Sequence, residues 1–186
     1  MKTGLILIDF QNDYFPGGRM ELTGVEAAAG KAADLLDLFR KQKWPVFFVQ
    51  HIATGEHASF FLPGTSGVEI HASLQPAPGE VLVRKHYPNS FRETPLQTEL
   101  ENASVVKLVI CGAMSHMCID ATTRAAADLS FECMVVADAC ATRDLQFGSD
   151  TIPAGQVHGA FMAALGAAYA RITTFEELSR EIFAES

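Results

Sequence analysis

Short apolar runs recur along the chain, and longer segments with helical spacing of their apolar residues lie between them. The runs are four to seven residues long and mainly apolar, which is typical of strands buried on both faces of a parallel sheet. We predict strands at residues 5–8, 46–50, 81–84, 105–111 and 133–137, with a weaker sixth at 171–173. The alternation of runs and helical segments predicts an α/β fold built from βαβ units.

Helix signals lie between and after these strands. The predicted helices are residues 25–43, 118–129, 153–169 and a last one that begins at residue 174. Pro45 ends the first helix, and Pro153 suits the first position of the third. Thr174 and Glu177 form a capping box at the start of the last. Residues 160–170 are apolar but too few to span a bilayer, which requires about 20 residues, so we predict a buried helix there.

The connection at residues 52–79 is unusual in its length. It contains three Pro and four Gly and has no sustained periodicity. Loops of this length are uncommon in compact domains and are often functional. We interpret it either as a wall or lid of a site or as a contact between subunits. No repeat, linker or change in composition divides the chain, so we predict a single domain over residues 1–186.

Composition narrows the class of protein. With 48% hydrophobic and 19% charged residues, the chain is expected to form a compact globule. Its 14 basic and 22 acidic side chains give a formal net charge of −8, without the basic surface that nucleic acids and anionic membranes require. The expected partners are small molecules and copies of this chain. We expect a cytoplasmic protein, whose four cysteines are free thiols.

Polar residues at the ends of predicted strands are candidates for chemistry, because open parallel sheets bind ligands at the carboxyl ends of their strands. Asp9, Lys85 and Cys118 follow three different apolar runs. Together they support acyl transfer through a thioester, with Asp9 shuttling a proton and Lys85 stabilising charge. We expect a helix N-terminus and Lys85 to lower the pKa of Cys118. The turn at residues 112–115 would direct backbone N–H groups at a developing oxyanion.

Taken singly, each of these residues also has a structural interpretation. A cysteine that opens an alanine-rich helix is often a packing residue. Asp9 can cap a loop together with Asn12 and Asp13. Lys85, next to Arg84, can be ordinary surface charge. Their shared position at strand ends favours the catalytic interpretation.

Three separated motifs resemble those of the isochorismatase-like cysteine hydrolases and occur in that family's order. They are LILIDFQNDYF, VRKHYPNSF and VICGAMSHMCIDATTRAAADLSFECMVVADACATRD. The resemblance implies a three-layer αβα sandwich with a six-stranded, mainly parallel sheet. It also implies a catalytic triad of Asp9, Lys85 and Cys118, a cis peptide bond between Ala113 and Met114, and an oxyanion hole made by the N–H groups of Met114 and Cys118.

The presence of Cys118 separates two branches of this family. Members that hydrolyse the enol ether of isochorismate typically lack the cysteine, whereas amide-hydrolysing members such as nicotinamidases and N-carbamoylsarcosine amidohydrolases keep it. The resemblance therefore implies a hydrolase of a non-peptide C–N bond in a small amide, whose identity the sequence does not give. An isochorismatase-type enol ether hydrolase and a non-catalytic binding protein are the alternatives.

Nicotinamidases bind a metal ion through an Asp-x-His motif and a further histidine. His51, His57 and His71 have a related spacing here, but Val49 stands where the aspartate is expected. Loss of that anionic ligand weakens the case for Zn²⁺ or Fe²⁺. We therefore predict no metal and no other cofactor, and we interpret the histidines as loop or subunit-contact residues.

Five residues beside the motifs are candidates for the walls of a substrate pocket, since a planar amide suits aromatic walls with few polar anchors. They are Gln11, Phe15, Tyr87, Phe91 and His116. His116 lies two residues before Cys118, where it would either select the leaving group or fix the turn. The apolar composition and the resemblance favour a homodimer or a dimer-based homo-oligomer.

Overall fold

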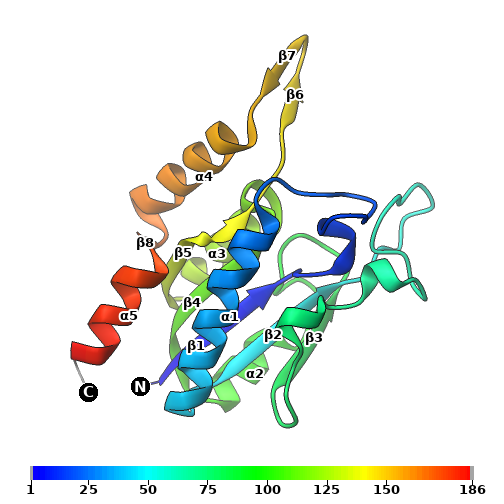
Figure 1. The fold of residues 1–186 in the computed structure, drawn as a ribbon. Coiled ribbons are helices and arrows are strands. Elements are labelled where there is room, and N and C mark those ends of the chain that lie inside the picture. The colour runs from blue at the N-terminus through cyan, green and yellow to red at the C-terminus, as the bar shows by residue number, and fades with distance from the viewer. Residues whose placement is uncertain (1, 185–186) are drawn as a thin grey trace.

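The computed structural model describes residues 2–184 and contains a six-stranded parallel sheet (Figure 1). The strand order is β3-β2-β1-β4-β5-β8, and every neighbouring pair is parallel. The strands are β1 (Lys2–Ile8), β2 (Val46–His51), β3 (Val81–Lys85), β4 (Val105–Ala113), β5 (Glu132–Ala141) and β8 (Arg171–Thr173). All six predicted strands are present, and β4 and β5 extend past their predicted ends.

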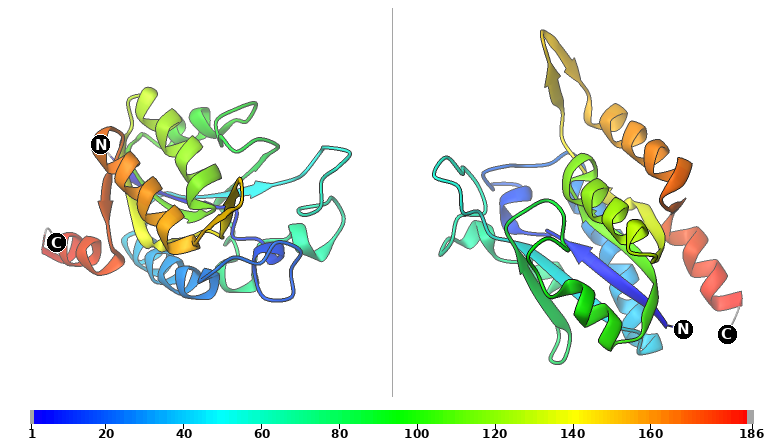
Figure 2. Two further views of the ribbon diagram at one scale, coloured as in Figure 1. Left: turned by 90° about the horizontal axis from the view of Figure 1, so that it is seen from above. Right: turned by 180° about the vertical axis from the view of Figure 1, so that it is seen from behind.

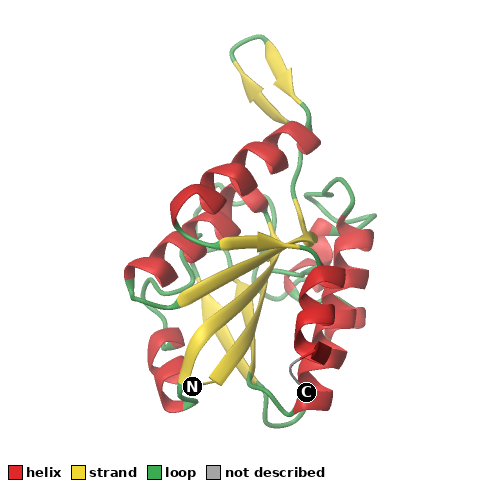
Figure 3. Cartoon of the chain, turned by 90° about the vertical axis from the view of Figure 1, so that its left-hand side faces the viewer, coloured by secondary structure: helices red, strands yellow, loops and turns green. Residues whose placement is uncertain are grey.

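Helices cover both faces of the sheet and give the molecule three layers (Figures 2 and 3). They are α1 (Val25–Gln42), α2 (Leu96–Asn102), α3 (Asp120–Asp128), α4 (Ala154–Ala168) and α5 (Phe175–Ala184). Leu5 and Leu7 of β1 belong to the core that α1 and α5 cover. Ile6 and Ile8 belong to the core under α2, α3 and α4. Because both sides of the strand are buried, its sequence is continuously apolar.

Several helix ends agree with the sequence signals. The first helix begins at Val25 as predicted, and Lys43 caps its end in the left-handed conformation with φ of 56°. Pro153 is the N-cap of α4 rather than its first residue. The capping box is confirmed, since a Glu177 carboxylate oxygen accepts from the Thr174 N–H at 3.0 Å and Thr174 Oγ1 accepts from the Glu177 N–H at 3.3 Å.

The prediction that residues 160–170 form a buried helix is wrong for the single chain. One side of α4 packs against the sheet through buried residues such as Met162 and Leu165. The opposite side is exposed and consists largely of glycine and alanine, with Ala163 as an example. Apolar residues occupy both sides of the helix, so the sequence pattern does not distinguish the buried side from the exposed one. Within residues 2–184, no helix is long and apolar enough to cross a membrane.

Two elements have no counterpart in the sequence predictions. Helix α2 is short and buries only two side chains, Leu96 and Leu100. Strands β6 (Leu145–Phe147) and β7 (Asp150–Ile152) form an antiparallel hairpin that projects from the body of the molecule (Figure 1). Each strand of this hairpin has three residues, which is too short for a period-two pattern to be recognised.

The order of the strands creates a switch point between β1 and β4. From β1 the chain adds β2 and β3 on one side, and from β4 it adds β5 and β8 on the other. The connections that leave the carboxyl ends of β1 and β4 therefore diverge, and such a crevice is where open α/β sheets bind ligands. Asp9 directly follows β1, and Cys118 lies on the turn after β4.

Candidate active site

Asp9 and Lys85 form a buried ion pair at the carboxyl edge of the sheet. Lys85 Nζ lies 2.8 Å from Asp9 Oδ2, and neither side chain has any exposed surface. Asp9 has φ of 55°, a left-handed conformation that aspartate tolerates better than most residues. Lys85 ends β3 and also donates to the Pro88 carbonyl oxygen at 3.0 Å. Its long side chain reaches past β2, which lies between β3 and β1.

Cys118 lies on a tight turn that begins where β4 passes the end of β1. Gly112 has φ of 138°, and a Cβ atom there would collide with the Ile8 carbonyl oxygen, so the turn requires glycine. The peptide bond between Ala113 and Met114 is cis. A π-helical turn, Ser115–Ile119, precedes α3. Cys118 is therefore inside this turn and does not begin the α-helix as predicted.

The thiol of Cys118 completes the cluster, because Cys118 Sγ lies within 4.8 Å of a carboxylate oxygen of Asp9. Burial and the Asp9 carboxylate raise the pKa of Cys118 far above its ordinary value, although Lys85 opposes the shift. Burial lowers the pKa of Lys85, but the charges of Asp9 and Cys118 raise it by more. The resting site thus holds a neutral thiol beside a carboxylate and an ammonium group.

The expectation that the pKa of Cys118 is lowered is therefore wrong for the resting site. The side chain is only 4% exposed, and desolvation disfavours the thiolate there. A neutral thiol requires a base, and Asp9 is the adjacent carboxylate. Lys85 pairs with Asp9 by charge, and within residues 2–184 no residue donates a well-formed hydrogen bond to either side-chain oxygen of Asp9. Its free lone pairs suit it to receive a proton.

A comparison with protein families matches residues 3–175 to the isochorismatase domain. The chain belongs to the isochorismatase family. It is 53% identical over 176 residues to the isochorismatase family protein YddQ of Bacillus subtilis, covering 95% of this chain and 98% of that protein. A crystal structure from Oleispira antarctica, described as an isochorismatase hydrolase, matches with a TM-score of 0.92 and 54% identity over 95% of each chain.

Streptothricin hydrolase of Streptomyces noursei is a more distant relative of this isochorismatase-family hydrolase. The two are 32% identical over 170 residues. The match covers 87% of this chain and 59% of the streptothricin hydrolase.

His51 is part of the site of this isochorismatase-family hydrolase, although the sequence interpretation placed it in a loop or subunit contact. One ring nitrogen of His51, a carboxylate oxygen of Asp9 and Cys118 Sγ all lie within 4.8 Å of one another. Burial lowers the pKa of His51 and outweighs the opposing effect of Asp9, so the ring is neutral near pH 7. His51 ends β2, between the strands that carry Asp9 and Lys85. The strand-end rule that selects those two residues also selects His51.

Gln11, a predicted pocket residue, holds the main chain of His51 in place. Its Oε1 accepts from the His51 N–H at 2.8 Å, and its Nε2 donates to the His51 carbonyl oxygen at 2.8 Å. The same Nε2 donates to the Val68 carbonyl oxygen at 2.7 Å. The Gln11 side chain is fully buried. It therefore fixes the end of β2 and joins it to the long connection that follows.

Residues 52–79 form a wall of the site, and we call them the wall loop. The buried carboxylate of Asp13 accepts a hydrogen bond from the Phe61 N–H at 2.6 Å. The Phe61 ring packs against Tyr14 and His51, with ring centroids 4.6 Å and 5.8 Å apart. These contacts favour the interpretation of residues 52–79 as a wall of the site. A role of the wall loop in a contact between subunits stays a prediction.

Tyr14 is a second neighbour of the cluster that the sequence reasoning did not select. Its side chain is almost completely buried. Burial, followed by the charges of Cys118 and Asp9, raises the pKa of Tyr14 well above its ordinary value. The residue thus contributes a neutral phenol near the thiol. It lies in a three-residue 3₁₀ helix, Asn12–Tyr14, which leaves no periodic signal in the sequence.

Three of the predicted pocket residues make contacts away from the triad. Phe15 stacks on His71 with centroids 3.7 Å apart, and both line a cavity of about 400 Å³ between the wall loop and the segment after β1. The guanidinium carbon of Arg92 lies over the Tyr87 ring, 3.6 Å from the ring centroid. The Phe91 ring stacks near Phe131, with centroids 6.1 Å apart. Their roles in substrate binding stay predictions.

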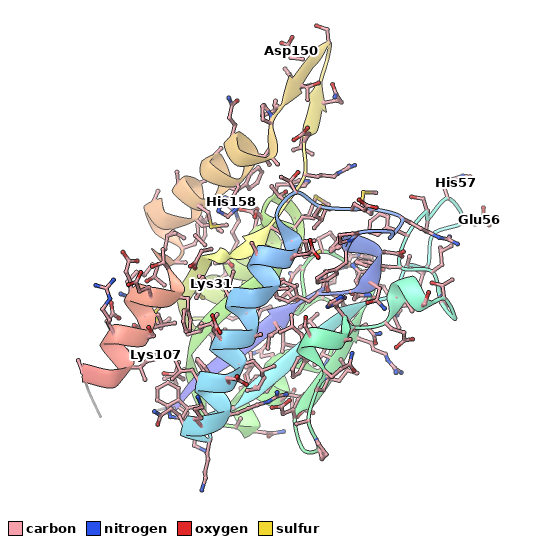
Figure 4. The ribbon with its side chains drawn as sticks, viewed as in Figure 1. Lys31, Glu56, His57, Lys107, Asp150 and His158 are labelled. Carbon is pink, nitrogen blue, oxygen red and sulfur yellow. The ribbon has the colours of Figure 1, made fainter. Side chains whose placement is uncertain are left out.

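Hydrogen bonds on the β5 side hold the turn that carries Cys118. His116 Nδ1 lies 2.6 Å from Thr142 Oγ1, which favours the turn-fixing role over selection of a leaving group. The buried hydroxyl of Ser115 donates to the Ala141 carbonyl oxygen at 3.3 Å and lies 2.8 Å from Nδ1 of His158. His158 belongs to α4 (Figure 4). The turn is therefore joined to both β5 and α4.

The residues of this site do not fit the metal centre of the nicotinamidases. His57 lies at the outer tip of the wall loop (Figure 4), and His71 stacks on Phe15. Asp9, His51 and Cys118 supply a carboxylate, an imidazole and a thiol in one place. The place of the aspartate in the Asp-x-His motif is taken by Val49, a buried apolar side chain that offers no ligand atom.

Proposed function

We propose that this isochorismatase-family hydrolase cleaves a C–N amide bond of a small molecule through a thioester on Cys118. The observation that carries the proposal is the convergence of thiol, carboxylate and ammonium groups in one buried corner, after β4, β1 and β3. A nucleophile beside a base that a third group orients is the arrangement that nucleophilic catalysis requires. Asp9, Lys85 and Cys118 would be the catalytic residues.

In the acylation step, Cys118 Sγ attacks the carbonyl carbon while its proton passes to Asp9. Because the thiol is neutral at rest, proton transfer accompanies formation of the C–S bond. Lys85 provides the compensating positive charge beside Asp9. The oxyanion would accept hydrogen bonds from the backbone N–H groups of Met114 and Cys118. When the C–N bond breaks, the proton on Asp9 moves to the leaving nitrogen.

In the deacylation step, a water molecule attacks the thioester carbon. Asp9 takes one proton from the water as the new C–O bond forms. The C–S bond then breaks, and the proton returns from Asp9 to the sulfur of Cys118. One amide and one water thus give one carboxylic acid and one amine or ammonia, and the site returns to its resting state.

Burial of the charged groups favours catalysis over a role as a binding protein. Dehydrating a carboxylate and an ammonium costs several kcal/mol per ion, which their attraction only partly offsets. Asp9 and Lys85 are nevertheless fully buried, and the Cys118 side chain belongs to the core under α2, α3 and α4 rather than to a surface that a partner protein could contact.

The first experiment measures release of ammonia and carboxylate from a panel of nicotinamide, benzamide, an N-carbamoyl amino acid, a ureide and a lactam antibiotic, with isochorismate alongside. We expect hydrolysis of at least one amide, and we expect Cys118→Ala to lower kcat by at least about 10³-fold with an unchanged circular dichroism spectrum. Isochorismate hydrolysis that survives in Cys118→Ala would establish the enol ether reaction instead. Inactivity of the native protein on every compound would favour a binding protein.

A second variant, Asp9→Asn, separates the base from the nucleophile. Loss of the carboxylate removes one cause of the raised pKa of Cys118, while Lys85 remains to favour the thiolate. We expect iodoacetamide to alkylate Cys118 at least about tenfold faster at pH 7, while amide hydrolysis falls at least about 10²-fold. Asp150→Asn, on the exposed hairpin, is the control. An unchanged single-turnover rate in Asp9→Asn would remove Asp9 from proton transfer.

A further inference from the structure

His51 has a polar atom at the reaction centre that the mechanism above does not use. Its ring nitrogen lies within 4.8 Å of both an Asp9 oxygen and Cys118 Sγ. No described residue forms a hydrogen bond with the ring, which packs against the tilted ring of Phe61 with centroids 5.8 Å apart. The side chain is partly exposed, whereas Asp9 is fully buried. One ring nitrogen therefore faces the place where a substrate would meet the thiol.

The surroundings hold His51 in this position. Gln11 bonds both the N–H and the carbonyl oxygen of His51, so the backbone cannot rotate without breaking both bonds. Phe61 packs against the ring, and Asp13 holds the Phe61 backbone. A side chain with both its backbone and its ring fixed is preorganised to bind one atom at one place.

The separations limit what can lie between His51 and Asp9. A hydrogen bond to nitrogen or oxygen spans about 2.9 Å, so two groups within 4.8 Å can bind one shared heavy atom. There is no room for a larger group directly between them. In the proposed acylation, the atom that must meet Asp9 at this place is the leaving nitrogen, which takes the proton from Asp9.

From this geometry we propose that His51 accepts a hydrogen bond from the leaving nitrogen and restricts the substrate to amides whose nitrogen is unsubstituted. This proposal rests on the proposed amide hydrolysis and specifies its substrate class. A primary carboxamide or terminal carbamoyl nitrogen carries hydrogens, so it can donate to His51 while its lone pair receives the proton from Asp9. An ester oxygen has no hydrogen to donate, and an N-alkyl group would occupy the limited space beside the imidazole.

The experiment compares three compounds with the same acyl group: the carboxamide that the native protein hydrolyses fastest, its N-methyl amide and its methyl ester. We expect His51→Leu to lower kcat/KM for the carboxamide about 10²-fold and to change that for the ester less than about threefold. His51→Gln keeps an acceptor oxygen on a side chain of related length, so it should restore part of the carboxamide rate. The native protein should disfavour the N-methyl amide, and His51→Ala should reduce that preference.

Two further measurements separate this role from others. The pH profile of Cys118 alkylation by iodoacetamide should be unchanged in His51→Leu, and a large displacement would show instead that His51 is the base for the thiol. Equal losses on carboxamide and ester would overturn the leaving-group role while leaving the thioester mechanism intact. Carboxamide hydrolysis that persists in Cys118→Ala would overturn the proposed function itself.

Discussion

Two connections extend from the same edge of the sheet, and they differ in how they are attached to it. The wall loop contains only two short 3₁₀ turns, Ser66–Val68 and Ala72–Leu74, yet many hydrogen bonds hold it to the segment after β1. The hairpin Leu145–Ile152 is regular secondary structure, but its hydrogen bonds with described residues all lie within the hairpin itself. Regular structure and attachment to the fold are therefore separate properties.

The attachment of the wall loop comes from buried polar side chains that bond its backbone. Gln11, Asp13 and Gln50 all act in this way. Such bonds replace the ladder that a strand would have, because a buried backbone group without a partner is costly. The wall loop is consequently a fixed part of the site. Changes in the hairpin should leave the site unaffected. Variants in matched pairs test this difference.

The largest effect is expected for Asp13→Ala. The carboxylate accepts hydrogen bonds from the N–H groups of Phe61 at 2.6 Å and Arg19 at 3.2 Å, and it is buried. Its removal leaves a buried N–H without a partner, so the free energy of unfolding should fall by about 3 kcal/mol, measured by urea denaturation. Asp150→Ala on the hairpin should stay within about 0.5 kcal/mol. Similar values for the two variants would refute the anchoring of the wall loop by Asp13.

A smaller effect is expected for Gln11→Leu, which keeps the side-chain volume and removes three hydrogen bonds. Two of them hold His51, and the third reaches the Val68 carbonyl oxygen. Gln50 Nε2 also donates to that carbonyl at 3.0 Å, which leaves it satisfied. We expect a loss of about 2 kcal/mol and faster hydrogen exchange of the His51 N–H. The control is Gln146→Leu, whose exposed bond to Thr151 should contribute almost nothing. Unchanged exchange in Gln11→Leu would remove Gln11 as the support of His51.

The end of the wall loop gives a prediction about pH. Arg40 of α1 bonds both carboxylate oxygens of Glu80 at 2.8 Å, and the Ala77 N–H donates to one of them. Burial raises the pKa of Glu80, but the hydrogen bonds from Arg40 and Ala77 lower it by more. A carboxyl group with a lowered folded-state pKa stabilises the fold above its unfolded pKa, and this contribution is lost as pH falls through the folded pKa.

Glu80→Gln should therefore cost about 1 kcal/mol at pH 7, and the difference from the native protein should shrink below about pH 4. Thermal unfolding from pH 7 to pH 3.5 measures both quantities. Arg40 is about one-third exposed, with 34% of its side chain accessible, so screening by salt keeps the effect modest. A difference that grows as pH falls would contradict the assigned sign.

The sequence predicts well those features that repeat along the chain. Mainly apolar runs identify the strands, and the position of Asp9 and Lys85 at the ends of two of these runs places both residues at one edge of the sheet. The same rule could have included His51, which ends β2 and lies between them. The spacing of the histidines relates His51 to a metal motif, whereas its position at the end of β2 relates it to Asp9 and Lys85.

Features that depend on tertiary contacts were not predicted. The raised pKa of Cys118 follows from burial and from the nearby Asp9 carboxylate, neither of which the local sequence contains. The bonds from Gln11 to His51 join residues that are 40 positions apart. The absence of the hairpin from the sequence prediction has a different cause, because each of its strands has only three residues and its side chains are mostly exposed, so no apolar pattern marks it in the sequence.

The smallest effect is expected when the hairpin is removed. The chain leaves the body at Asp144 and returns at Ala154, whose N–H donates to Asp144 Oδ1 at 2.8 Å, so the ends of the excursion are already adjacent. Replacing residues 145–152 with two glycines should therefore change the free energy of unfolding by less than about 0.5 kcal/mol and leave amide hydrolysis intact.

The exposed Phe147, with 78% of its surface accessible, loses no packing in the single chain. Phe147→Ser is the milder control, and sedimentation measurements on both variants show whether assembly depends on this residue. If the variant without residues 145–152 kept its fold but lost hydrolysis, the hairpin would have to contribute to an active site, although it lies apart from the site of its own chain.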